Sequence, residues 1–312
     1  MEYRTLGQTG MEVSVLGFGA SSLGGVFHKI DEQAGIRATR LALEKGINYI
    51  DVSPYYGLTT AEKVLGRALE GVPRDTYYLS TKVGRYGNDP EEGFDFSAQR
   101  VTASVDESLS RLGLESVDLV FCHDIEFGDL DQVVNETIPA LRTLREQGKV
   151  RFIGVSGYPL KVFTEVIERT EIDCILSYCR YSLNDTGLEK LFPFLRDNGV
   201  GVVNASPLSM GLLTQRGAPD WHPASEEIRT ACQRAARYCA DQGENLSKLA
   251  IRFSTGNPQV PTTLVSTANP EHIEQNIRWL EEPADGELLA KVREILAPVQ
   301  NQAWLSGRPE NN

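Results

Sequence analysis

An apolar run that ends in an acid, Ile47-Asn-Tyr-Ile-Asp51, is followed along the chain by two more runs of the same kind. The second, Tyr77-Tyr-Leu-Ser-Thr81, ends just before Lys82, and the third, Val117-Asp-Leu-Val-Phe121, ends just before His123. Short runs rich in apolar and β-branched residues are typical of buried strands in parallel sheets. If these runs are successive parallel strands, their carboxyl ends meet at the edge where α/β folds bind ligands.

The same rhythm of apolar runs and helical patterns continues along the whole chain, without a low-complexity linker. A hairpin signal comes first, around Gly7-Gln-Thr-Gly10. The predicted strands are Val13–Gly19, Ile47–Ile50, Tyr77–Thr81, Val117–Phe121, Phe152–Val155, Cys174–Leu176, Gly201–Asn204 and Thr262–Val265. The first predicted helix runs from an N-cap at Asp31 to Lys45. The next are Thr60–Leu69, Ala98–Leu112, Leu130–Gln147, Leu160–Arg169 and Gly187–Asn198, and more than one helix is predicted from Ser225 to Thr255.

This alternation predicts a (β/α)8 TIM barrel formed by a single domain of residues 1–312. An N-terminal β-hairpin precedes the barrel, and two extra helices, Pro270–Leu280 and Asp285–Leu296, follow it with a tail through Trp304. The competing fold is an open, doubly wound sheet. The first strand ends in Gly17-Phe-Gly19-Ala-Ser, which lacks the third glycine of a dinucleotide-binding turn, so the barrel is preferred.

Composition and charge narrow the class of protein. The net charge of −12 over 312 residues repels phosphate backbones, which argues against nucleic acid as a partner. No window approaches the roughly 18 apolar residues that span a bilayer, and the start, Met1-Glu-Tyr-Arg-Thr5, is no signal peptide. The five cysteines show neither a CxxC pair nor a metal-binding spacing with histidine. We expect a cytoplasmic enzyme with a small-molecule substrate, no metal and no membrane contact; its oligomeric state stays open.

An acid, a phenol, an amine and an imidazole follow the early strands, and such a set suits proton transfer coupled to hydride transfer. The segments Asp51-Val-Ser-Pro-Tyr-Tyr56, Leu79-Ser-Thr-Lys82 and Val120-Phe-Cys-His123 resemble the catalytic tetrad of the aldo-keto reductase superfamily. The resemblance implies a TIM barrel, a nicotinamide cofactor and a C-terminal segment that closes over the substrate.

The tetrad resemblance also suggests a role for each residue. Tyr56 would donate and accept the proton, with its pKa lowered by the ammonium of Lys82. Asp51 would pair with Lys82 and limit the cost of a buried charge. His123 would orient the substrate oxygen and relay the proton during oxidation.

The cofactor residues implied by the resemblance lie late in the chain. Ser156 resembles the serine that holds the nicotinamide carboxamide, although Gly157 replaces the asparagine that usually follows it. Ser177 stands where the family commonly has a glutamine. The segment Ser206-Pro-Leu208-Ser-Met-Gly211 resembles the pyrophosphate loop, but Ala205 replaces the aromatic residue that normally stacks on the nicotinamide.

The segment Thr267-Ala-Asn-Pro-Glu-His-Ile-Glu-Gln-Asn276 resembles the adenosine-binding loop, with Gln275 and Asn276 as further expected contacts. NADP-preferring members commonly place lysine or arginine here, whereas this chain has Ser266 and His272, with Arg278 one turn later. These two residues pair poorly with a phosphate dianion. We therefore expect NAD as the cofactor, with NADP as the alternative.

Several longer blocks resemble the plant-type L-galactose dehydrogenases within this superfamily: Gly84-Arg-Tyr86, Gly93-Phe-Asp-Phe-Ser97, Cys122-His-Asp-Ile-Glu-Phe-Gly128 and Trp221-His-Pro-Ala-Ser225. This resemblance implies oxidation of an aldose, L-galactose, at C1 to the lactone. The expected substrate-binding residues are Tyr55, Arg85, Asp124, Glu126, Phe127, Trp221 and Trp304. The alternatives are oxidation of related sugars such as L-fucose, reduction of aldehydes with NADPH, and a non-catalytic nucleotide-binding scaffold.

Overall fold

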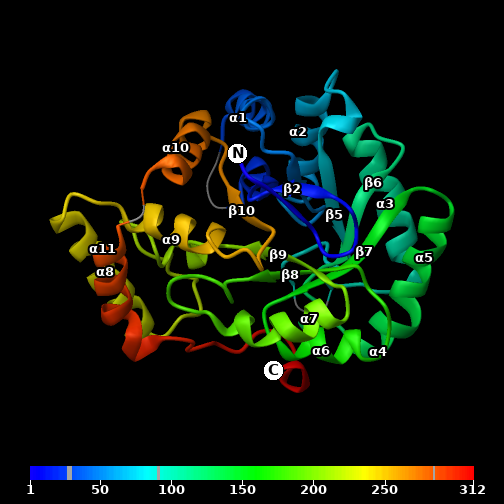
Figure 1. The fold of residues 1–312 in the computed structure, drawn as a ribbon. Coiled ribbons are helices and arrows are strands. Elements are labelled where there is room, and N and C mark those ends of the chain that lie inside the picture. Colours follow the sequence, from blue (N-terminus) through cyan, green and yellow to red (C-terminus); the bar gives the residue numbers. More distant parts are fainter. Residues whose placement is uncertain (27–29, 90–91, 284) are drawn as a thin grey trace.

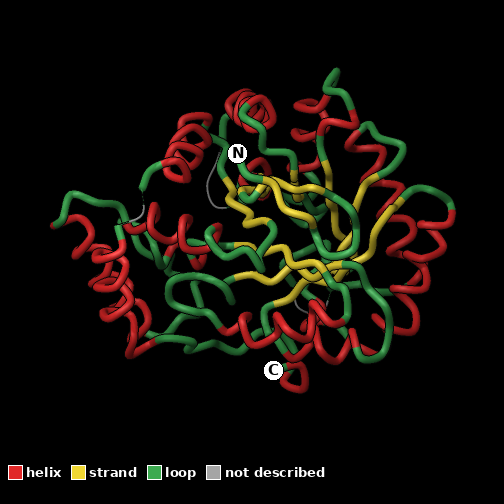
Figure 2. The backbone as a smooth tube through the Cα atoms, in the orientation of Figure 1, coloured by secondary structure: helices red, strands yellow, loops and turns green. Residues whose placement is uncertain are grey.

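The computed structural model of the protein describes residues 1–26, 30–89, 92–283 and 285–312. Within these residues, eight parallel strands form a closed barrel in the order β10-β3-β4-β5-β6-β7-β8-β9. The barrel strands are β3 (Leu16–Gly19), β4 (Tyr49–Asp51), β5 (Tyr78–Val83), β6 (Val117–Cys122), β7 (Val150–Gly157), β8 (Cys174–Tyr178), β9 (Gly201–Ala205) and β10 (Thr262–Ser266). Figure 2 shows the strands gathered at the centre with helices around them. The predicted (β/α)8 barrel is confirmed.

The helices lie outside the barrel (Figure 1). They are α1 (Glu32–Glu44), α2 (Thr60–Leu69), α3 (Ala98–Leu112), α4 (Leu130–Gln132), α5 (Ile138–Glu146), α6 (Lys161–Ile167), α7 (Phe192–Asp197), α8 (Glu226–Asp241), α9 (Leu246–Thr255), α10 (Pro270–Glu281) and α11 (Gly286–Leu296). Asp31 caps α1 as predicted, since its side chain accepts a hydrogen bond from the Gln33 amide. Gly113 ends α3 in the left-handed conformation that closes many helices.

The predicted first strand is divided in two. Its first part belongs to β2 (Glu12–Ser14), which pairs with β1 (Tyr3–Thr5) in the N-terminal hairpin, and β3 begins only at Leu16. The hairpin residues Leu6 and Met11 share a buried apolar cluster with Tyr49 of β4. The hairpin therefore closes the amino-terminal end of the barrel and leaves the carboxyl end for a site.

Proline divides the predicted helix Leu130–Gln147. A π-helical turn at Val133–Thr137 separates α4 from α5, and Pro139 is the second residue of α5. Proline has no amide hydrogen and clashes with the preceding turn, which accounts for the widened helix. The predicted helix Gly187–Asn198 likewise begins as a 3-10 turn and becomes α-helical only at Phe192.

The loop after β4 depends on one close backbone contact. Gly57 has φ +60°, and a Cβ there would lie 2.0 Å from the carbonyl oxygen of Gly24. Gly24 ends a 3-10 helix, Ala20–Gly24, that follows β3. Glycine at position 57 therefore lets two strand-end loops pack together next to Tyr56.

We predict that Gly57→Ala lowers the free energy of unfolding by roughly 2–5 kcal/mol, because it adds overlap to an unfavourable backbone conformation. Gly71→Ala is the matched control, since Gly71 has φ +76° with nothing within 4 Å of the added carbon. The control should cost only about 1–2 kcal/mol. Urea unfolding of both variants measures the difference, and equal losses would contradict the packing argument.

Candidate active site

A buried ion pair joins the ends of β4 and β5. The Lys82 ammonium pairs with the Asp51 carboxylate and donates to the hydroxyl of Tyr56 at 3.0 Å and to the carbonyl of Val52 at 3.1 Å. Lys82 is only 1% exposed and Asp51 2%. The other Asp51 oxygen accepts a hydrogen bond from Ser80 at 2.7 Å. Both charges therefore have the partners that a buried pair needs.

His123 completes the group from the end of β6. Its ring lies edge-on to the Tyr56 ring, with centroids 5.7 Å apart. Nδ1 is 3.1 Å from the Ser53 hydroxyl, and Nε2 is 3.7 Å from a carboxylate oxygen of Asp124. The structure thus brings together the four side chains that the sequence pointed to.

Burial is the largest single influence on the pKa values of Lys82, His123 and Tyr56, but it does not set the direction of every shift. It lowers the pKa of Lys82, but the charge of Asp51 and the contact with Tyr56 outweigh that effect, so the net shift is upward and the amine stays charged. Burial lowers the pKa of His123 to about 3, so its imidazole is neutral near pH 7. For Tyr56, burial outweighs the opposing charge of Lys82 and raises the pKa to about 12. The expected lowering of the Tyr56 pKa is therefore wrong, although Lys82 does act in the expected direction.

Arg85 and Asp124 form a second polar group beside the tetrad. The two side chains are paired, and Arg85 also donates to the Tyr55 hydroxyl at 3.0 Å while lying 3.8 Å above the Tyr55 ring. Asp124 has φ +51°, and its amide donates to the Ser156 hydroxyl at 2.9 Å. Phe127 stacks on Phe94 with ring centroids 4.8 Å apart.

The remaining expected substrate residues, Trp304, Trp221 and Glu126, differ in their burial and in their contacts. Trp304 stacks on Tyr158 with centroids 4.6 Å apart, at the end of β7. Trp221 is 60% exposed and lies against His222. Glu126 is fully buried, and its Oε1 accepts hydrogen bonds from the Tyr158 amide, the Tyr178 hydroxyl and the Ser306 hydroxyl.

Sequence reasoning missed the residues that support these groups. Ser80 lies two residues before Lys82 on the same face of β5, so strand alternation was a usable signal for it. Ser53 follows Asp51 by two residues and could have been found in the same way. Tyr178 and Ser306 gave no such signal, because their partner Glu126 lies 52 and 180 residues away.

Two buried hydroxyls without hydrogen-bond partners among the described residues lie where the sequence predicts the cofactor, near the carboxyl ends of β8 and β9. Ser177 and Ser209 each have a fully buried hydroxyl without a hydrogen-bond partner among the described residues. Ser206, Ser209, Met210 and Gly211 all have positive φ. The amides of Ser209 and Gly211 already donate to the carbonyls of Ser206 and Leu208 within this loop. These features fit a nicotinamide dinucleotide, with the loop from Ser206 to Gly211 at its phosphates.

The expected adenosine residues surround the end of β10. The Ser266 hydroxyl donates to Ser22 at 2.8 Å and accepts from Ser21 at 2.9 Å, so it is already engaged. His272 lies 3.1 Å from the Thr267 hydroxyl and is exposed. Gln275 and Arg278 are exposed, whereas Asn276 is buried.

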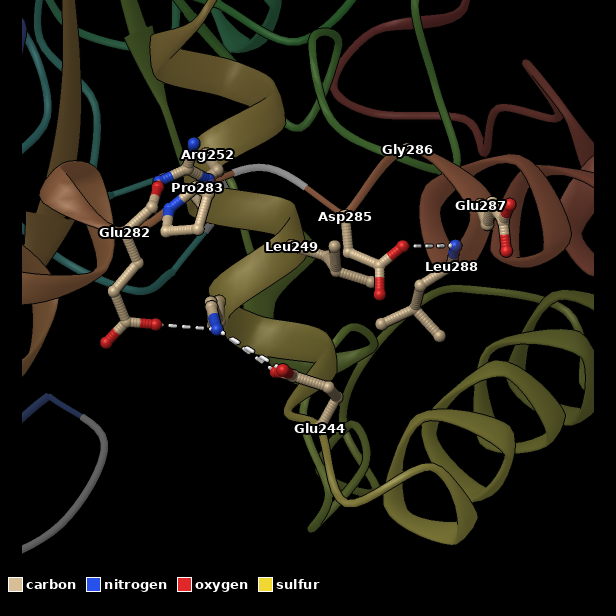
Figure 3. A pocket seen from close by; sticks show the side chains of 10 residues that line it. Glu244, Leu249, Arg252, Glu282, Pro283, Asp285, Gly286, Glu287 and Leu288 are labelled. Carbon is tan, nitrogen blue, oxygen red and sulfur yellow. Dashed lines mark hydrogen bonds and ion pairs between the residues drawn. The ribbon is translucent and has the colours of Figure 1, made fainter.

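A separate pocket of 640 Å³ lies between α9 and the start of α11 (Figure 3). Its lining includes none of the tetrad residues. The Lys248 ammonium in it is already paired with Glu244 and Glu282, and Arg252 donates to carbonyls at the end of α10. Its cationic groups are thus occupied by the protein itself, and the tetrad edge remains the candidate site.

Glu126 gives this region a pH-dependent stability. Burial, followed by the charge of Asp124, raises the pKa of Glu126 from 4.5 to about 8. The folded protein therefore keeps a proton that the unfolded chain releases between these values, so stability falls as pH rises through this window. Glu126→Gln keeps the shape and removes the titration.

We predict that wild type loses stability relative to Glu126→Gln between about pH 5 and about pH 8, by up to roughly 1.4 kcal/mol per pH unit. Urea unfolding at both values measures this difference. Parallel changes in the two proteins would show that Glu126 titrates normally.

Comparison with known proteins agrees with the observed fold. L-galactose dehydrogenase of Arabidopsis thaliana is 48% identical over 100% of this chain and 99% of its own. D-arabinose 1-dehydrogenase of Saccharomyces cerevisiae is 35% identical over 86% of each chain. The structure of an aldo-keto reductase from Bacillus halodurans, in its holo form, has a TM-score of 0.79 and 29% identity, covering 98% of both chains. The aldo/keto reductase family model matches residues 15–297, and the chain belongs to this family.

Proposed function

We propose that this protein oxidises an aldose, L-galactose above others, at C1 to the lactone, with NAD as the hydride acceptor. The observation that carries the proposal is the buried contact of Lys82 with Asp51 and Tyr56, with His123 beside it. The full-length similarity to L-galactose dehydrogenase supports the choice of sugar. We further propose that residues 1–312 act as one domain in the cytoplasm, where its five buried, free cysteines would stay reduced.

Tyr56 is assigned the proton transfer. Its hydroxyl accepts a hydrogen bond from the Lys82 ammonium, which stabilises the phenolate that takes the proton of the anomeric hydroxyl. Asp51 keeps Lys82 charged and fixed, so the ammonium needs no reorganisation during the reaction. A bound oxidised nicotinamide supplies the hydride acceptor and a positive charge to the same edge of the barrel.

His123 is assigned the orientation of the substrate oxygen. A pKa of about 3 makes an imidazolium rare near neutrality, so a neutral hydrogen-bonding role is favoured over the proton relay first expected. Its Nδ1 faces Ser53, which leaves Nε2 for the ligand side. This arrangement fixes one ring orientation.

The sugar is assigned to the Arg85 and Asp124 group. Paired charges that are mostly buried can form charge-assisted hydrogen bonds with hydroxyls. Tyr55, Phe127 and Trp304 offer aromatic faces at the same edge. Glu126 and Trp221 are also assigned to the sugar; Glu126 is buried under protein contacts, and Trp221 is 60% exposed.

The cofactor is assigned to the carboxyl ends of β7 to β10. Ser156 and Ser177 would hold the carboxamide, and Ser206, Leu208 and Gly211 the pyrophosphate. Ser266, His272, Gln275 and Asn276 would surround the adenosine. The family uses nicotinamide cofactors, and the specific preference for NAD rests on the absence of lysine and arginine at positions 266 and 272.

Initial rates over a panel of aldoses, including L-galactose, L-fucose and D-arabinose, test the proposal with NAD and NADP in parallel. We expect L-galactose with NAD to give the highest kcat/KM, and the lactone to appear before the open-chain acid. A better turnover of another aldose, or the acid as first product, would overturn the substrate assignment. Tight cofactor binding without turnover of any sugar would instead favour a nucleotide-binding scaffold.

We predict that Tyr56→Phe retains the fold and cofactor binding but loses about 10²–10⁴-fold in kcat, because only the proton-transferring hydroxyl is removed. Tyr78→Phe is the matched control: it makes the same change at the first residue of β5, the opposite end of the strand from the tetrad. Steady-state rates and cofactor fluorescence titration measure both variants. A Tyr56→Phe enzyme with more than about half the wild-type kcat would remove Tyr56 from its role.

We also predict that His272→Arg improves kcat/KM with NADP relative to NAD, since a guanidinium pairs with the 2′-phosphate by charge-assisted hydrogen bonds of about 1.5–3 kcal/mol each. The ratio of kcat/KM for the two cofactors measures the effect. A wild-type enzyme that already prefers NADP would contradict the assignment of this loop and point to Arg278.

A further inference from the structure

The C-terminal tail crosses the rim of the barrel after α11. In Figure 1 it runs in red from α11 to the side of α6, where the C-terminus lies. Three contacts fix its course: the Asn301 amide donates to the Asn184 carbonyl at 3.1 Å, Trp304 stacks on Tyr158, and Lys161 donates to the carbonyl of Glu310 at 2.6 Å. The tail therefore contacts loops that follow several successive barrel strands.

The end of the tail donates hydrogen bonds to backbone carbonyls of the loop after β6. The short 3-10 helix Ile125–Phe127 follows β6, and the carbonyls at the end of such a helix have no partner within it. Asn311 Nδ2 donates to the carbonyls of Glu126 at 2.9 Å and Gly128 at 3.1 Å. Arg308 Nε donates to the carbonyl of Phe127 at 3.2 Å. Three consecutive carbonyls of this loop are thus held by the tail.

The fit between tail and loop is close. Gly307 has φ +76°, and a Cβ there would lie 2.2 Å from the Glu126 carbonyl oxygen. Asn311 is only 4% exposed, although its neighbour Asn312 is exposed. The Ser306 hydroxyl also donates to the Glu126 carboxyl at 3.1 Å. The Asn311 side chain is therefore buried in a specific contact with the loop after β6.

The loop that receives these bonds also carries Asp124 and Phe127, whereas His123 directly follows β6, where its amide donates to the Val83 carbonyl of β5 at 2.8 Å. We propose that Asn311 is a positioning residue for substrate binding: its amide fixes the Glu126–Gly128 backbone and, through it, Asp124 and Phe127. The inference rests on the proposed function, because it takes these two residues as the sugar contacts. Asn311 itself acts only through the loop. Asp51, Lys82 and Tyr56 stand on β4, β5 and their loop, so the proton-transfer group is outside its reach.

Asn311→Asp tests the proposal, because it keeps the shape of the side chain and removes its donor. Asn312→Asp is the matched control: it makes the same change of shape and charge one residue away, where the amide donates only to the tail carbonyls of Ser306 and Arg308. We expect Asn311→Asp to raise KM for L-galactose about 5- to 30-fold, the range that corresponds to the net loss of one to two hydrogen bonds. The kcat and the KM for NAD should stay within about twofold, and Asn312→Asp should match wild type.

Amide hydrogen exchange gives a readout that needs no substrate. Exchange at residues 124–130 should be faster in Asn311→Asp than in wild type and Asn312→Asp, while the segment around Lys82 stays unchanged. Unchanged exchange in this loop, an equal effect of both variants, or a loss of kcat without a change in KM would overturn the proposal. If wild type oxidises no aldose, the proposed function fails, and the exchange comparison still decides whether Asn311 positions the loop.

Discussion

The buried ion pair between Asp51 and Lys82 is the interaction on which the site depends. Two charges out of water are tolerated only when each has further partners, and here Ser80, Val52 and Tyr56 provide them. Removing one partner from such a pair typically costs about 3–5 kcal/mol. The pair also sets the chemistry, because Lys82 is the group among the described residues whose charge favours the phenolate of Tyr56. The Asp51–Lys82 pair therefore links the geometry of the barrel to the proton transfer by Tyr56.

Burial disfavours the phenolate of Tyr56 and the imidazolium of His123. These pKa shifts explain why the two residues have different roles. Tyr56 keeps its proton in the protein itself, with a pKa of about 12, whereas His123 at about 3 is neutral. The neutral imidazole of His123 can orient the substrate oxygen. The phenol of Tyr56, hydrogen-bonded to Lys82, can exchange a proton when the oxidised cofactor adds a second positive charge nearby. The tail that follows α11 holds the loop that carries Asp124. The proton-transfer group lies on β4, β5 and the loop after β4.

Much of this architecture could be predicted from the sequence, because its signals are local. Apolar runs at regular spacing predicted the strands, and the polar residues within two positions after these runs were Asp51, Lys82 and His123. The π turn before Pro139 was readable in principle, since proline inside a helical pattern interrupts it. The contacts between residues far apart in the chain could not be predicted from the sequence. The bonds from Asn311 to Glu126 and Gly128 join residues more than 180 positions apart, and the Tyr56 pKa depends on a depth of burial that no motif records.

In the proposed mechanism, the charge of Lys82 controls the proton affinity of Tyr56 during oxidation. The pH dependence of kcat for aldose oxidation, measured in wild type and in Lys82→Met, tests this role. Because the phenolate is the active form, kcat should rise with pH through the pKa that Tyr56 has when the positively charged, oxidised cofactor is bound. Loss of the ammonium raises that pKa, so the rising limb should move up by about one pH unit or more in the variant. A rising limb at the same pH in both enzymes would show that Lys82 does not control the proton affinity of Tyr56.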